Sequence, residues 1–120
     1  MSTVAPAHPL DDASAAELER AVAILGDSGN LSDRAFFACG HRVEPPPGAL
    51  ATGADVERTI RLIGHDPATG KSFDAHVSLT SGTVAGFTLV DKGQAPITGR
   101  DVADVYGVLF ENEDYLAALA

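Results

Sequence analysis

The sequence predicts an α+β fold, in which one helix packs on a four-stranded antiparallel sheet and is followed by C-terminal helices. Apolar and polar residues alternate strictly along residues 71–80, which is the period of a half-buried strand. Apolar residues instead recur at helical spacing along residues 14–25 and again after residue 97. We therefore expect a flexible tail at residues 1–7, one α+β domain at residues 8–92 and a helical segment at residues 93–120.

The first helix is predicted to begin after Ser14. Glu17 follows three residues later, and this spacing allows a capping box that satisfies unpaired backbone donors. Gly26 is a natural stop. The apolar stripe of this helix, which is the expected cover for one face of the sheet, consists of Leu18, Ala21, Val22 and Leu25.

Four strands are predicted next. Residues 34–44 form the first, with weaker alternation, and the prolines at 45–47 end it. Residues 56–65, 71–80 and 83–90 form a meander joined by two tight turns that are rich in Gly, Pro and Ser.

Turn lengths set the expected pairing of the meander strands. Asp66 pairs with Lys71 across a four-residue loop, which is a common hairpin length. A two-residue loop at 81–82 places Phe73 opposite Val90. The face that the helix covers is then expected to contain Ile60, Leu62, Phe73, Ala75, Val77, Leu79, Val84 and Val90.

The opposite face of the predicted sheet carries a second apolar set. Its members are Ile63, Ala85, Phe87 and Leu89. An apolar stripe on the second face of a sheet indicates that something covers it. Two covers remain open: the chain's own C-terminal segment, or a partner chain for which these four residues form the binding site.

The C-terminal segment is predicted to contain two helices. Thr98 and Asp101 have the spacing of a capping box. Asn112 is the expected cap of a second, shorter helix. The apolar residues at helical spacing are Val102, Val105, Tyr106 and Leu109 in the first helix and Tyr115, Leu116 and Leu119 in the second.

Composition narrows the possible partners. The formal net charge of −9 and the pI near 4.6 argue against nucleic acid or an anionic membrane. No apolar run approaches the length of a membrane span. The N-terminus lacks the pattern of a secretory signal, and a lone Cys39 suits a reducing compartment, so we expect a cytoplasmic protein.

No group of residues has the spacing of an active site or metal site. The sequence contains no His-x-His, Cys-x-x-Cys or His-Glu-x-x-His pattern. His65 and His76 are expected on one face but about 13 Å apart, at roughly 3.4 Å per residue, which is too far to share a metal ion. Cys39 lies two residues from His41 without a third group to orient the pair, so we expect a small buried or half-buried hydrophobe. The chain is therefore predicted to contribute no catalytic, cofactor-binding or metal-binding residue.

Several stretches together resemble one protein family. Residues 8–18 read HPLDDASAAEL and resemble the opening of copper amine oxidases. Residues 69–84 read TGKSFDAHVSLTSGTV and are similar to the family's stretch of TGK, an aromatic residue, an acidic residue and A-x-VSLT-x-GTV. Residues 96–102 (PITGRDV) and 115–119 (YLAAL) resemble the segment that follows. The resemblance implies the first of two small non-catalytic domains that precede the catalytic β-sandwich, with a cystatin-like roll as its fold.

The resemblance also implies where the chemistry lies. These enzymes oxidise primary amines to aldehydes, with ammonia and hydrogen peroxide as products. They use copper held by three His and a topaquinone made from a Tyr in an Asn-Tyr-Asp/Glu-Tyr motif. Tyr106 and Tyr115 are the only tyrosines here, and neither fits that motif. Copper and topaquinone are therefore expected only in a catalytic partner.

Three functional hypotheses follow. The first is a non-catalytic accessory subunit, similar to the small second subunit of some actinobacterial tyramine oxidases. It would dock on a larger copper amine oxidase chain through the Phe87 and Leu89 face or through the C-terminal helices. The second is a free-standing cystatin-like binding module with no oxidase partner. The third is an enzyme that uses His41, His65 or His76.

Overall fold

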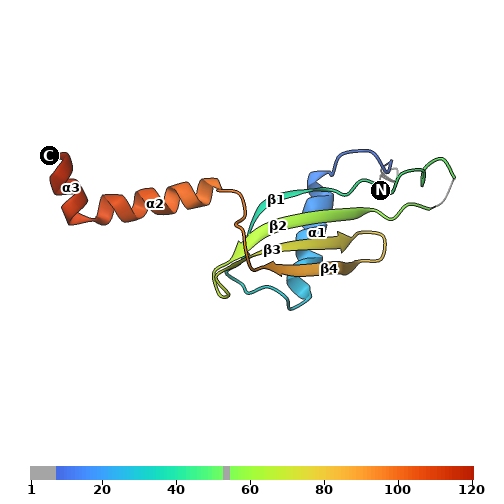
Figure 1. Cartoon of the computed structure of the whole chain (residues 1–120), viewed down its shortest axis with the longest axis horizontal. Coiled ribbons are helices and arrows are strands. Elements are labelled where there is room, and N and C mark those ends of the chain that lie inside the picture. Colours follow the sequence, from blue (N-terminus) through green and yellow to red (C-terminus); the bar gives the residue numbers. More distant parts are fainter. Residues whose placement is uncertain (1–7, 53–54) are drawn as a thin grey trace, which may run out of the picture.

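A computed structural model describes residues 8–52 and 55–120, and it confirms the predicted α+β class (Figure 1). The tail expected at residues 1–7 lies outside the described residues. The elements in chain order are α1 (Ala15–Asp27), β1 (Phe36–Arg42), β2 (Thr59–Asp66), β3 (Lys71–Ser78), β4 (Thr83–Val90), α2 (Gly99–Glu111) and α3 (Glu113–Leu119).

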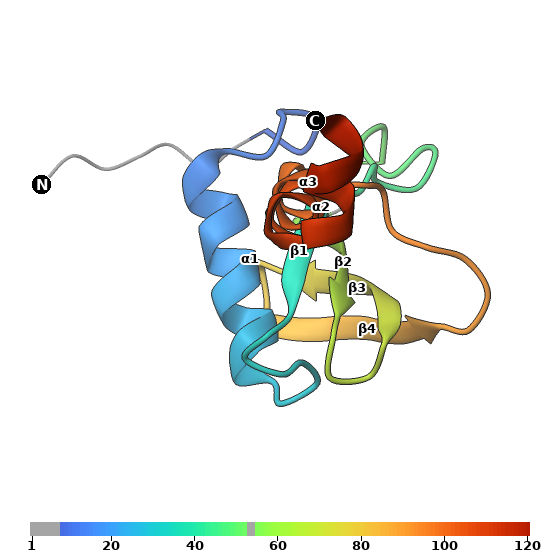
Figure 2. The same cartoon turned by 90° about the vertical axis from the view of Figure 1, so that its left-hand side faces the viewer.

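The four strands form one antiparallel sheet in the order β1-β2-β3-β4. Helix α1 covers one face of this sheet (Figures 1 and 2). The predicted capping box at its start is present, since the Ser14 side chain accepts from the Glu17 amide. The core between helix and sheet consists of Ala21, Leu25, Ile60, Leu62, Phe73, Ala75, Val77 and Leu79, which are all buried.

The pairing of β2 with β3 is as predicted. Asp66 lies opposite Lys71, and Arg61 lies opposite His76. The positive φ of Gly70 allows the chain to turn at the end of this loop. The turn chemistry and the alternation both select this register, because a slip of one residue would expose the whole apolar set.

The predicted pairing of β3 with β4 is wrong from the turn onwards. Ser78 pairs with Thr83, so residues 79–82 form a four-residue loop in place of the predicted two-residue loop. Val77 lies opposite Val84, whereas His76 lies opposite Gly86, so Ala85 is an extra residue in β4. Such a β-bulge transfers every later side chain of the strand to the other face. Val90 consequently pairs with Ser72 on the outer face instead of joining the core.

Helices α2 and α3 project from one end of the sheet (Figure 1). The protein measures 66 × 34 × 28 Å, and its radius of gyration of 18.8 Å exceeds the value of about 14 Å expected for a compact chain of this length. Neither helix contains a buried residue. Among the described residues, no helix combines the length and the apolarity needed to cross a membrane.

The start of α2 is anchored to the sheet. The Ala95 amide donates to Ser72 Oγ over 2.9 Å. The Arg100 guanidinium lies over the Phe36 ring, 4.8 Å from its centroid. The predicted capping box is present, because Thr98 and Asp101 exchange side-chain and backbone hydrogen bonds. The linker and the first turn of α2 therefore sit on the end of the sheet, and the rest of the helix extends beyond it.

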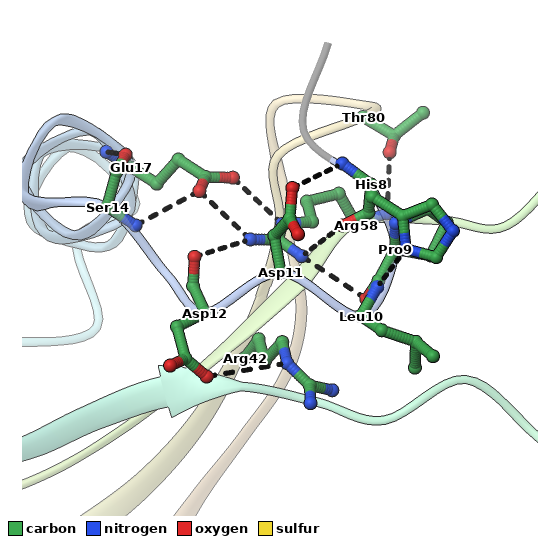
Figure 3. A network of polar contacts seen from close by, with 10 residues as sticks. All are labelled: His8, Pro9, Leu10, Asp11, Asp12, Ser14, Glu17, Arg42, Arg58 and Thr80. Atoms are coloured by element: carbon green, nitrogen blue, oxygen red, sulfur yellow. Dashed lines mark hydrogen bonds and ion pairs between the residues drawn. The ribbon is translucent and has the colours of Figure 1, made fainter.

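Arg58 ties the N-terminal segment and α1 to the sheet (Figure 3). Its Nε and Nη2 atoms donate to the two carboxylate oxygens of Glu17 over 2.8 and 3.0 Å. The same guanidinium reaches the backbone carbonyls of His8, Pro9 and Asp12. This pair is largely shielded from solvent, so it contributes more than an exposed ion pair does.

Candidate partner-docking surfaces

The four residues predicted to bind a partner do not share one face of the sheet. Ile63 lies on the outer face, half-buried and opposite Asp74. Ala85 is the bulged residue of β4 and is exposed. Phe87 and Leu89 lie on the face that α1 covers, because they pair with the buried residues Ala75 and Phe73.

Phe87 belongs to the periphery of the core. Its ring stacks on Phe73, with centroids 6.0 Å apart and an angle of 18° between the planes. Val84 and Phe87 both pack against the core cluster, which a regular strand would not allow at this spacing. The apolar stripe expected on the second face is therefore wrong at Phe87. Leu89, near the end of β4, keeps 37% of its surface exposed.

The centre of the outer face is occupied by a polar cluster. Arg61 donates to both carboxylate oxygens of Asp74, and its guanidinium lowers the pKa of that carboxyl. His41 and His76 lie opposite Arg61 on the two neighbouring strands. A charged and polar surface of this kind needs no cover from a partner.

A depression of about 490 Å³ lies beside this cluster at the edge strand β1. Arg42 approaches Asp12 at 4.0 Å and Glu44 at 3.9 Å across its wall. The full lining is Asp12, His41, Arg42, Val43, Glu44, Arg61 and His76. Because both signs of charge are present in similar number, the depression selects neither an anion nor a cation.

The other reactive side chains are dispersed. Cys39 is exposed opposite Ile63, so the expectation that it is buried or half-buried is wrong. A bulge at Ala38, between the paired residues Phe37 and Cys39, disturbs the alternation of β1. His65 packs beside Phe36, with ring centroids 5.7 Å apart. Within residues 8–52 and 55–120, no three His, Cys, Asp or Glu side chains gather as a metal site would require.

Helix α2 presents the largest uncovered apolar surface. At 100° per residue, the predicted stripe of Val102, Val105, Tyr106 and Leu109 forms its centre. Val108 and Phe110 flank this stripe on opposite sides and are 68% and 60% exposed. The apolar arc therefore spans about 200°, which is wider than a helix needs to cover one surface.

Two open grooves run along this arc. The larger, about 540 Å³, is lined by Ile97, Val102, Val105, Tyr106 and Leu109 together with Gln94 and Asp101. The smaller, about 280 Å³, is lined by Asp104, Val105, Val108 and Leu109. Val105 and Leu109 thus form the ridge between two apolar grooves, a shape that suits insertion into a partner.

Sequence reasoning missed two parts of this arrangement. It predicts the stripe of α2 but assigns Val108 and Phe110 to no surface, although a full helical wheel places both on its flanks. The role of Arg58 carries no local signal, because its partners Glu17 and Asp12 lie more than 40 residues away.

Comparison with known proteins assigns the fold. Residues 14–86 match the model of the AGAO-like N2 domain. The chain is 32% identical over 118 residues to a primary amine oxidase of Arthrobacter sp. (strain P1), which covers 98% of this chain and 18% of that protein. It is 31% identical to a histamine oxidase of Arthrobacter globiformis, covering 93% of this chain and 17% of that protein.

A solved structure shares the architecture. A copper-containing benzylamine oxidase from Hansenula polymorpha matches with a TM-score of 0.77 at 20% identity, over 94% of this chain and 19% of that one. The chain spans about a fifth of the length of the proteins that it matches. It belongs to the AGAO-like N2 domain family and is homologous to the N-terminal region of copper amine oxidases.

Proposed function

We propose that this chain is a non-catalytic accessory unit of a copper-dependent primary amine oxidase and docks on a separate, larger catalytic chain. The observation that carries the proposal is the match to amine oxidases along 98% of this chain but only 18% of the relative. By analogy with tyramine oxidases that have a small second subunit, this chain would bind a catalytic chain that carries all the residues needed for amine oxidation.

The residues of this chain support the proposal that a separate chain carries out the oxidation. Neither Tyr106 nor Tyr115 lies in an Asn-Tyr-Asp/Glu-Tyr motif, and the sequence contains no His-x-His pair. His41 and His76 lie opposite Arg61 on the two strands beside β2, and His65 lies at the far end of β2. We therefore propose that the catalytic chain holds copper and topaquinone and that it alone oxidises the amine.

Affinity purification from the native host tests the proposal. The tagged chain is purified, the co-eluting proteins are identified by mass spectrometry, and the eluate is assayed for amine-dependent hydrogen peroxide. The tag fused to an unrelated acidic protein of similar size is the control. We expect a stoichiometric larger chain that carries the topaquinone motif and His-x-His, with peroxide formation above the control.

Two results would contradict the proposal. A chain that elutes alone and is monomeric would favour a free-standing binding module. Amine-dependent peroxide production by the chain alone, purified from a foreign host, would show that it is itself the enzyme.

A further inference from the structure

Helices α2 and α3 expose more apolar surface than an isolated domain normally does. The exposed large residues are Ile97, Val102, Val105, Tyr106, Val108, Phe110, Leu116 and Leu119, between 42% and 77% accessible. Eight such residues fall within residues 97–119. Apolar residues exposed singly are normal on a protein surface, whereas many in one short segment indicate an interaction site.

The shape of this surface indicates two-sided contact. Helix α1 uses one stripe to cover one sheet face, whereas the apolar arc of α2 includes both flanks of its stripe. Grooves lie on both sides of the ridge formed by Val105 and Leu109. A single flat partner surface would leave one flank in water, so the partner must contact α2 from two sides.

The charge around this surface adds a second requirement. Residues 93–120 contain one basic residue, Arg100, and five acidic residues, Asp101, Asp104, Glu111, Glu113 and Asp114. At 100° per residue, Asp104 and Glu111 border the apolar arc on its Val108 side. The Asp101 carboxylate accepts from the Thr98 amide at the helix start, and Glu113 and Asp114 form the first turn of α3. A complementary partner therefore has an apolar cleft with a basic rim.

The relatives indicate which protein supplies that cleft. The match to the primary amine oxidase of Arthrobacter sp. (strain P1) covers 98% of this chain, so nearly all of α2 and α3 lies within the homologous region. The structural match over 94% leaves about seven residues unaligned, so most of the projecting segment belongs to the shared fold. In these proteins more than four-fifths of the chain lies outside the matched region.

We infer that α2 and α3, and not the sheet, form the docking surface for the catalytic part of a primary amine oxidase, which holds α2 in a two-sided apolar cleft with a basic rim. This docking presupposes the oxidase partnership proposed above. The Arg100–Phe36 and Ala95–Ser72 contacts hold α2 away from the sheet, so both of its flanks are accessible without unfolding.

Site-specific photocrosslinking in the native host tests the surface. The full chain carries p-benzoylphenylalanine in place of Tyr106 or Phe110 in α2, of Leu89 at the sheet, or of Leu50 in the loop before β2. Leu50 and Leu89 are 40% and 37% exposed, so all four positions are accessible. We expect crosslinks from Tyr106 and Phe110 to a chain that carries the topaquinone motif, and none from Leu50 or Leu89.

Each alternative outcome has a distinct meaning. Crosslinks to that oxidase from Leu89 alone would overturn the helical surface and leave the partnership intact. Crosslinks from α2 to a second copy of this chain, or no crosslink from α2 to any protein, would overturn the inference. If none of the four positions crosslinks to an oxidase, the proposed partnership is overturned as well. Crosslinks to an oxidase region of the same polypeptide would support the surface and overturn the separate-chain part of the proposed function.

Matched charge substitutions give a quantitative test on the captured oxidase. Leu116→Asp and the control Leu50→Asp alter residues that are 42% and 40% exposed. We expect Leu116→Asp and Val105→Asp to reduce oxidase recovery at least tenfold, and Leu50→Asp to leave it unchanged. Equal recovery for all three variants, each with a wild-type circular dichroism spectrum, would overturn the inference.

Discussion

The guanidinium of Arg100 lies over the ring of Phe36, with its central carbon 4.8 Å from the ring centroid. This contact joins the first turn of α2 to the first residue of β1. The hydrogen bond from Ala95 to Ser72 fixes the linker beside it. Together they set the direction in which α2 leaves the sheet, which determines how its apolar surface is presented.

Arg100→Ser should broaden the range of orientations that α2 adopts. The lost cation–π contact is worth about 0.5–1 kcal/mol at an exposed site, so the sheet domain should remain folded. Spin labels at Cys39 and at a cysteine introduced by Val108→Cys would report the change as a wider distance distribution. Lys92→Ser, an exposed change in the same linker, is the control. Identical distributions for the two variants would show that the contact does not orient the helix.

Phe87→Asp should destabilise the domain by about 3 kcal/mol or more. The substitution removes the ring that stacks on Phe73 and places a carboxylate against the core. Ala85→Asp, at the exposed bulge, should cost less than about 1 kcal/mol. Urea unfolding of both variants measures the difference. Similar small losses for both would indicate that Phe87 faces outward.

Glu17→Gln should cost on the order of 2 kcal/mol at pH 7. Hydrogen bonds from Arg58 lower the pKa of Glu17 from 4.5 to about 2. Because the folded pKa is depressed, this stabilisation is complete above pH 4.5 and is lost as the pH falls towards 2. Glutamine keeps one oxygen that can accept from the Ser14 amide, but its NH2 group replaces an oxygen that accepts from Arg58, so the change removes the charge together with one hydrogen bond.

The pH dependence provides the check on that assignment. The difference in unfolding free energy between wild type and Glu17→Gln should shrink steadily from pH 4.5 downwards. Glu19→Gln, an exposed change two residues further along α1, should show no such trend. A gap between wild type and Glu17→Gln that stays constant down to pH 2.5 would contradict the role of the Arg58 pair.

Gly64→Ala should destabilise the sheet by about 3 kcal/mol. A Cβ atom there would overlap the Phe36 carbonyl oxygen and the Phe73 ring, neither of which can move freely. Gly107→Ala meets no atom within 4 Å and should raise the helix content of α2, with a gain of up to about 1 kcal/mol for that helix. Thermal unfolding and circular dichroism distinguish the two. Equal effects would mean that the close packing at Gly64 is relieved by a backbone shift.

Local signals predict much of this fold. The helix caps at Ser14, Thr98 and Asn112 are all present, and each side chain accepts from the backbone amide three residues later. The β2–β3 hairpin is predictable to the residue because its loop and its alternation agree. The apolar stripe of α2 can likewise be predicted from the sequence, because helical spacing does not depend on what covers the helix.

Two of the errors have a common physical cause. A bulge adds one residue without changing composition, so the alternation up to Val84 gives no indication that Phe87 and Leu89 change face. Gly86 beside the bulge is the available signal, because glycine inside a strand often marks one. The same cause explains the exposure of Cys39, which follows the bulge at Ala38.

The length of the molecule affects how its mass should be measured. A compact protein reaches a radius of gyration of 18.8 Å at roughly twice this number of residues. A monomer will therefore elute from a sizing column near the volume of a globular dimer. Light scattering or sedimentation equilibrium, which do not depend on shape, will give the number of chains in solution and in any complex with an oxidase.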